Sequence, residues 1–310
     1  MTGWTAWFCR AAWGALAVSA FGGVQAQALY VPSAYKASFG DGFKAEKHKT
    51  GYYSAYTDAD NYNGVEYARH HFGIGAWSSS GEQVAYVTKH TSTDGTVKNL
   101  TVGYNTLDAS RPLWTVDGTY AQRWSDQTTS EFTVNRDRVE VQPSLVNHVL
   151  ASQYNVSLEH KVTQPVRVQF GVGEIRYTDG NHRPLAKIKA TYDVLPVQGL
   201  SLQLRSRYFK NTDTTVSSGY FNPYRFVENL GVVELNRQVA DWSISASLGQ
   251  GRQAGGDDAK TRAQMVELSA TSPITRRVFV RTKAGYFRSL GYNGPDFIYR
   301  YVSEDVIVTF

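Results

Sequence analysis

The chain of 310 residues has one cysteine, two methionines and no long hydrophobic run after its first thirty residues. The single Cys9 excludes a disulfide framework and cysteine-based metal or haem sites. The mean hydropathy of −0.38 excludes a bundle of membrane-spanning helices. A formal net charge of +5 is modest for this length and gives no indication of nucleic acid as a partner.

Residues 1–26 have the pattern of a secretory signal peptide. Arg10 supplies a positive charge, residues 11–21 form a short apolar stretch, and small residues around Ala26 offer a cleavage site. The apolar stretch is shorter than the roughly 20 residues that a membrane-spanning helix needs. We therefore predict an exported chain whose folded domain is 27–310.

Aromatic residues are abundant, with 20 Tyr, 14 Phe and 7 Trp, and such a composition favours strands. In residues 200–208, apolar and polar side chains alternate, and the same pattern recurs at 114–123, 154–161, 187–194, 242–249 and 277–286. A soluble β-sandwich alternates too. Segments of about ten alternating residues that end in Tyr or Trp favour a transmembrane barrel. The final Phe310 on an alternating strand is typical of the targeting end of outer-membrane barrels.

These observations predict an all-β chain forming a transmembrane antiparallel β-barrel. Sixteen strands fit the pattern, and fourteen is the alternative, because single-chain bacterial barrels have even strand numbers. The segment 139–151 does not alternate, and the spacing of its apolar residues after Pro143 predicts a short helix. Longer polar connections are expected at 178–183, 211–222, 251–260 and 288–296.

Several motifs occur together in the second half of the chain. They are RDRVE at 136–140, TDGNHR at 178–183, SLQLRSRYF at 201–209, GYFNPYRFVENLGV at 219–232, WSISASLGQGRQ at 242–253 and GPDFIYRYV at 294–302. In this order they resemble the C-terminal outer-membrane barrel of exopolysaccharide exporters, of the poly-N-acetylglucosamine porin and cellulose-export subunit type. In that family tetratricopeptide repeats precede the barrel, whereas no 34-residue period is visible here. The resemblance implies export of a surface polysaccharide.

A sixteen-stranded barrel can hold an aqueous channel. The alternation predicts a mildly basic lumen in which acids such as Asp117, Glu159, Asp193 and Glu267 face the bases Arg167, Lys187, Lys189, Arg205, Arg207, Arg281 and Lys283. Such a lumen favours an anionic or neutral polysaccharide. The alternative is that these bases pair with carboxylates and only stabilise the wall of the barrel.

Two further groups of residues are candidate sites. The charged residues Arg136, Asp137, Arg138 and Glu140, followed by an apolar segment, suit a plug or constriction in the lumen, and deletion of 139–150 is then expected to raise conductance; a solvated turn is the alternative. Aromatic rings near an expected external loop suit stacking on sugars, and the alternative is the membrane girdle. These rings belong to Tyr220, Phe221, Tyr224 and Phe226.

No serine-hydrolase, zinc-protease or nucleotide-binding motif is present, so we expect no enzyme, cofactor or metal site. The predicted function is export of a surface polysaccharide across the outer membrane of a Gram-negative bacterium. The alternatives are a structural or adhesive barrel with a plugged lumen and a general diffusion porin. The expected partners are outer-membrane lipid, the barrel-assembly machinery, the polysaccharide and a separate periplasmic scaffold protein, and nucleic acid is not among them.

Overall fold

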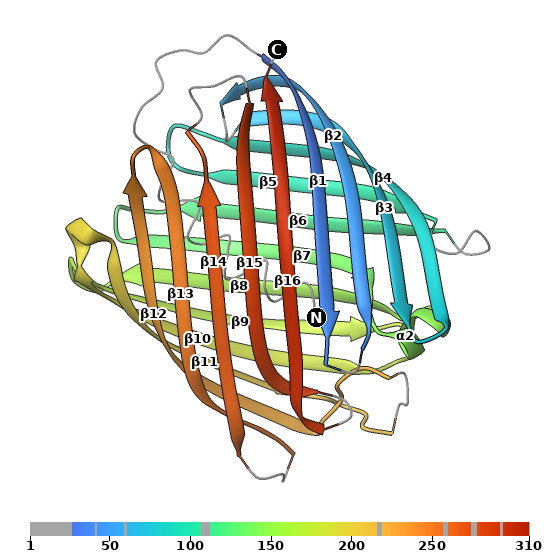
Figure 1. The fold of residues 1–310 in the computed structure, drawn as a ribbon. Helices are drawn as coiled ribbons and strands as arrows, with labels where there is room; N and C mark the ends of the chain where they lie inside the picture. Colours follow the sequence, from blue (N-terminus) through green and yellow to red (C-terminus); the bar gives the residue numbers. More distant parts are fainter. Residues whose placement is uncertain are drawn as a thin grey trace.

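The computed structural model describes residues 27–40, 42–58, 61–106, 112–215, 219–256, 260–273, 278–291 and 294–309. The predictions for the signal peptide and for Phe310 fall outside these residues. The described residues form sixteen strands, one short α-helix and one 3-10 turn (Figure 1). The strands are β1 Gln27–Phe39, β2 Lys44–Asp58, β3 Asn61–Ile74, β4 Trp77–Thr91, β5 Val97–Asn105, β6 Leu113–Arg123, β7 Thr128–Arg138, β8 Leu150–Lys161, β9 Val166–Tyr177, β10 His182–Leu195, β11 Leu200–Lys210, β12 Arg225–Val239, β13 Trp242–Gly255, β14 Thr261–Thr271, β15 Val278–Gly291 and β16 Gly294–Thr309.

Each strand pairs antiparallel with its neighbour in sequence, and β1 pairs with β16 to close the barrel. The closing register aligns Leu29 with Thr309 and Phe39 with Tyr299. Closure leaves no strand edge, which is the condition for strands to cross a bilayer, where no water can satisfy backbone groups. The prediction of sixteen strands is confirmed. In the part of the chain that the structure describes, no helix is long and apolar enough to cross a membrane.

Burial in this barrel is the reverse of that in a soluble protein. On β11, the outward Leu202, Leu204 and Tyr208 are exposed, and Leu204 keeps 70% of its surface accessible. The alternate residues Ser201, Gln203 and Arg205 face inward and are buried. Because a strand turns successive side chains to opposite faces, the alternation in the sequence becomes an apolar outside and a polar inside. The chain is therefore a transmembrane barrel.

Exposed aromatic side chains lie near both ends of the outward face. Tyr120, Trp124, Tyr192 and Trp242 lie toward the end that carries the termini of the barrel. At the other end the exposed rings are those of Tyr104, Trp114, Tyr154, Tyr208 and Tyr224. The outward positions between them hold mostly valine and leucine, together with Phe132, Phe170 and Ile188. Such paired girdles mark the two membrane interfaces.

The connections differ in length between the two ends of the barrel. At the end with the termini they are short, and the β12–β13 turn needs only Ala240 and Asp241, both with positive φ of 48° and 69°, which match the twist of a hairpin. The two longest connections, 139–149 and 211–224, lie together at the opposite end. The helix α2, Gln142–Val146, belongs to the first of them and confirms the predicted non-strand element (Figure 1).

Two of the expected polar connections are partly strand. The first half of the segment 251–260 is strand, because β13 continues to Gly255 before the chain turns into β14. The segment 288–296, predicted as a long polar connection, is mostly strand, because β15 continues to Gly291 and β16 resumes at Gly294. Polar and glycine residues there suggested a loop, but at the end of a barrel strand they extend the sheet beyond the apolar band.

Candidate functional site

The inner wall carries the basic side chains that the alternation predicted there. All seven lie at inward positions, and ion pairs join several of them to carboxylates. The pairs are Arg167–Asp193 at 3.1 Å, Lys189–Glu159 at 4.0 Å, Arg205–Glu234 at 3.3 Å, Arg207–Glu228 at 2.7 Å and Arg281–Asp305 at 3.8 Å. Lys187 and Lys283 complete the set, and Lys187 is buried. Four of these pairs link neighbouring strands, and Arg207 and Glu228, for example, lie directly opposite each other in the β11–β12 register. The pair Lys189–Glu159 instead joins β10 to β8 across the intervening β9.

Several inward carboxylates were missed by the sequence reasoning. Glu228 and Glu234 share the inward face of β12, Asp305 lies inward on β16, and Glu66 on β3 accepts a bond of 2.8 Å from Lys49. Glu228 and Glu234 are an even number of residues apart, so the alternation along β12 could have predicted that both lie on the inward face. With these acids included, the lumen is closer to charge balance than the predicted excess of bases implied.

Uncharged polar side chains fill much of the remaining inner wall. The Gln83 amide donates to Thr115 Oγ1 at 2.7 Å and accepts at its oxygen from the His70 ring, with Nε2 and Oε1 3.1 Å apart. On β8, Asn155 donates to Thr133 at 3.0 Å, and Ser157 accepts from Gln169 at 3.2 Å. Amide and hydroxyl groups in such density can exchange hydrogen bonds with the hydroxyls of a sugar chain.

The helix α2 reaches across the barrel. It follows β7 in the chain, yet Leu145 is buried in a cluster with Phe39, Phe72 and Tyr301, which belong to β1, β3 and β16 on the far side of the ring. Pro143 is the second residue of the helix, in the first turn, where its missing N–H leaves no intrahelical hydrogen bond unmade. The connection between β7 and β8 therefore spans the mouth of the barrel.

The four charged residues predicted to form a plug do not lie together in the structure. Arg136 shares a row with Val116 and Ser152 on the outward face and donates to Ser152 Oγ at 2.9 Å, so it does not belong to the lumen. Asp137 and Arg138 end β7, and Arg138 is buried. Glu140 lies between β7 and α2, where burial, reinforced by the charge of Asp137, raises the pKa of its carboxyl to about 7.

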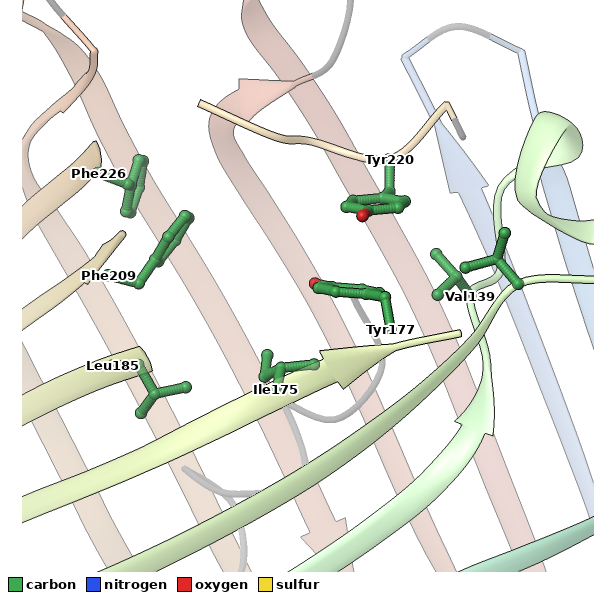
Figure 2. Close-up of a cluster of buried hydrophobic side chains, with 8 residues drawn as sticks. Val139, Ile175, Tyr177, Leu185, Phe209, Tyr220 and Phe226 are labelled. Carbon is green, nitrogen blue, oxygen red and sulfur yellow. The ribbon is translucent and has the colours of Figure 1, made fainter. Parts of the chain in front are cut away.

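A second segment lies over the same mouth, and sequence reasoning missed it as a covering element. It consists of residues 211–215 and 219–224 of the connection between β11 and β12. Its Tyr220 stacks on Tyr177 of β9 with ring centroids 4.2 Å apart and planes at 10° (Figure 2). Asn181, which is fully buried, donates to Tyr220 Oη at 3.0 Å and to Asn222 Oδ1 at 2.7 Å. Burial raises the pKa of the Tyr220 hydroxyl above its ordinary value.

Arg183 on β10 connects this segment to the barrel wall through ring contacts and hydrogen bonds. Its guanidinium carbon lies 4.4 Å from the ring centre of Phe209 and 5.2 Å from that of Tyr177. Its Nε donates to Asn211 Oδ1 at 2.7 Å, and its Nη2 donates to the carbonyl of Phe221. A cation between aromatic faces with its N–H groups satisfied is a stable buried arrangement. Asn181 and Arg183 come from the TDGNHR motif, which is the sequence signal for this site.

The two segments contact each other, and together we call their described residues, 139–149, 211–215 and 219–224, the cap. Gly219, with φ of +77°, packs so closely on Pro143 that a Cβ there would lie 2.4 Å from the proline ring. Val139 and Val149 pack with Tyr220 in the same hydrophobic cluster (Figure 2). The cap is thus held on one side by β9–β12 and on the other by β1–β3 and β16.

The four aromatic residues proposed to stack on sugars do not act as one surface. Phe226 is 1% exposed and stacks on Phe209 at 4.8 Å, and Tyr220 is buried against Tyr177. Phe221 packs at the edge of the same cluster. Only Tyr224 presents an exposed ring, beside which Lys210 Nζ lies 4.6 Å from the ring centre. Because Tyr220 and Phe226 pack inside the cluster, these two rings hold the cap in place.

The fold is similar to that of solved outer-membrane proteins. A chain described as a bacterial polysaccharide outer membrane secretin matches with a TM-score of 0.71 and 11% sequence identity, covering 93% of this chain and 99% of that one. The chain has an outer-membrane β-barrel fold. OccK11 (OpdR) of Pseudomonas aeruginosa matches with a TM-score of 0.46 and 10% identity over 92% of this chain and 96% of that one. No protein-family model and no curated protein matches the chain.

Proposed function

We propose that this protein is an outer-membrane channel that exports a surface polysaccharide. The observation that carries the proposal is a closed sixteen-stranded barrel with a hydrogen-bonding inner wall and a cap over one mouth. The likeness to a polysaccharide secretin over nearly the whole of both chains supports it, as does the order of motifs from 136–140 to 294–302.

We infer the orientation from the connections. In outer-membrane barrels the turns at the periplasmic end are short and the loops at the extracellular end are longer. The two longest connections form the cap. We therefore infer that the cap lies at the cell surface and that both ends of the barrel domain lie in the periplasm, where a separate scaffold protein would deliver the polymer.

The chemistry of the wall suits a neutral or weakly anionic polymer. Ion pairs such as Arg205–Glu234 neutralise bases that would otherwise hold a polyanion tightly. The amide and hydroxyl groups between them, such as Gln169 and Ser157, offer many weak hydrogen bonds. Transport requires binding that is strong enough to admit the passenger and weak enough to release it.

The cap accounts for how an export channel can stay closed to small solutes when no polymer passes. A permanently closed cap would instead fit the alternative function, a structural or adhesive barrel with a plugged lumen. The two functions differ in whether removal of the cap helix creates a channel that a polysaccharide then enters.

The test is single-channel conductance of the refolded chain in planar bilayers, compared with a variant in which residues 140–148 are replaced by an Asn-Gly turn. We expect rare openings in the unmodified chain, steady conductance in the variant, and block of that conductance by neutral or anionic oligosaccharides from the periplasmic side. A cationic oligosaccharide serves as the matched control.

Two results would contradict the proposal. Steady conductance that no oligosaccharide blocks would identify a diffusion porin. A capless barrel that refolds but does not conduct would identify a structural role. A clear preference for cations in reversed salt gradients would refute the assigned passenger charge, because the lumen would then select against an anionic polymer.

A further inference from the structure

Four arginines lie on the outward face of four successive strands, near the capped end of the barrel. They are Arg252 on β13, Arg262 on β14, Arg288 on β15 and Arg300 on β16, and we call them the arginine row. Arg252, Arg262 and Arg300 are exposed, and Arg288 is half-buried. These strands lie side by side in the barrel wall (Figure 1).

The strand register makes the row continuous. Arg252 and Arg262 are directly opposite each other. Arg288 is opposite Gln264, two residues from Arg262, and Arg300 is opposite Tyr286, two residues from Arg288. Direct neighbours on an antiparallel pair have Cβ atoms about 5 Å apart and diagonal neighbours about 7–8 Å. Like charges directly opposite each other are destabilising, so a bound anion would stabilise this part of the sheet.

The row lies where the apolar surface ends. Below it on the same outward face come Leu248 on β13, Leu268 on β14 and Val302 on β16, all about half exposed. Tyr286 lies next to the row, with Arg300 Cζ 5.8 Å from its ring centre. Aromatic residues in this position lie at the level of the lipid headgroups. The arginines therefore reach the headgroup layer.

The strands β1–β4, which continue the wall directly after β16, carry their outward charges differently. At the same end, on β1–β4, the outward Lys36 pairs with Glu46 at 3.5 Å and the outward Arg69 pairs with Glu82 at 3.4 Å. Among the described residues, no carboxylate pairs with Arg252, Arg262 or Arg300. Lys36 and Arg69 are thus neutralised by acids, whereas the row presents charges of one sign.

We propose that the arginine row binds a phosphate group of a lipid in the outer leaflet. The planar guanidinium donates two parallel hydrogen bonds to phosphate, and two guanidinium groups from directly opposed residues can hold one phosphate between them. The row faces the bilayer at headgroup depth, where lipid phosphates are concentrated. The choice of leaflet rests on the orientation inferred above, and the proposal does not depend on what passes through the lumen.

The test is native mass spectrometry of the refolded full chain in detergent, titrated with diphosphoryl lipid A. The double variant R252Q/R262Q is expected to bind about 30-fold more weakly, and each single variant about fivefold, because a basic residue near an anionic lipid surface contributes about 1 kcal/mol. R69Q is the matched control, an outward arginine at the same end that already has a carboxylate partner, and it should bind as the unmodified chain does.

Three outcomes would overturn the proposal. Equal binding by R252Q/R262Q and the unmodified chain would remove the row as the site. Equal binding of lipid A and a dephosphorylated lipid A would remove phosphate as the recognised group. Displacement of lipid A by inorganic phosphate at equal concentration would identify a site for free anions and not for a lipid. If the double variant does not refold, the single variants decide the first point.

Discussion

The contact of Leu145 with the far wall should decide whether the cap is closed. Leu145 is 5% exposed in its cluster with Phe39, Phe72 and Tyr301. Removing a buried leucine side chain down to alanine costs about 2–5 kcal/mol. In the variant Leu145→Ala, this energy is lost only in the closed state, because the open cap makes no contact with the far wall.

A loss of that size should raise the ratio of open to closed cap by about 30-fold at the lower end of the range, since each 1.4 kcal/mol is a factor of ten. We expect the lower end, because the contacts of Tyr220 and Gly219 with the rest of the cap remain. Planar-bilayer recordings should then show a proportional rise in the fraction of time that each channel is open.

A second readout follows the same opening without a conductance measurement. Digestion by a protease that cleaves after glutamate should cut after Glu140 only when the cap opens, and its rate should rise with the open population. The matched control is Leu204→Ala, which removes a leucine that is 70% exposed on the outward face and should change neither readout. Unchanged opening and unchanged cleavage in a folded Leu145→Ala barrel would refute the assignment of α2 as the closing element.

Three further predictions concern the cap and the wall. Because the raised pKa of Glu140 favours its neutral form in the closed cap, closure should weaken as the pH rises from 4.5 through about 7, and Glu140→Gln should remove this pH dependence of channel opening. Gly219→Ala should increase opening, since its Cβ would lie 2.4 Å from Pro143, whereas Gly180→Ala, also at positive φ but with open space around it, should not. Glu234→Gln leaves Arg205 without its carboxylate at 3.3 Å, so the reversal potential should shift toward anions and urea should unfold the barrel more easily, while the outward Glu304→Gln should change neither.

The alternation of the sequence determined the wall of the barrel. In residues 200–208 the period of two separates leucine and tyrosine from serine, glutamine and arginine, and the structure turns those sets outward and inward. This works because the pleat of a strand is a local property that each segment expresses independently of the rest of the chain. The break in alternation after residue 138 likewise predicted the helix at the mouth.

Strand register determined which inward charges form ion pairs. The sequence places Arg205 and Arg207 on the inward face, but their carboxylate partners Glu234 and Glu228 lie on another strand. Which residues pair depends on the register between neighbouring strands. The alternation assigns each residue to a face, but it does not determine which residue of the next strand lies opposite. The charge of the wall therefore followed from pairing that no single segment encodes.

The contacts of the cap depended on tertiary structure. The sequence predicted a short helix after Pro143, but Leu145 and Tyr220 lie outside the alternating segments, and neither segment by itself indicates which side chains bury them. Their partners, Tyr301 and Tyr177, are brought to them only when sixteen strands close into a ring narrow enough for a short helix to cross. The sequence thus determined the strands and the faces that they present. Closure of the barrel determined which distant side chains meet at its mouth, because those contacts require the whole ring to be in place.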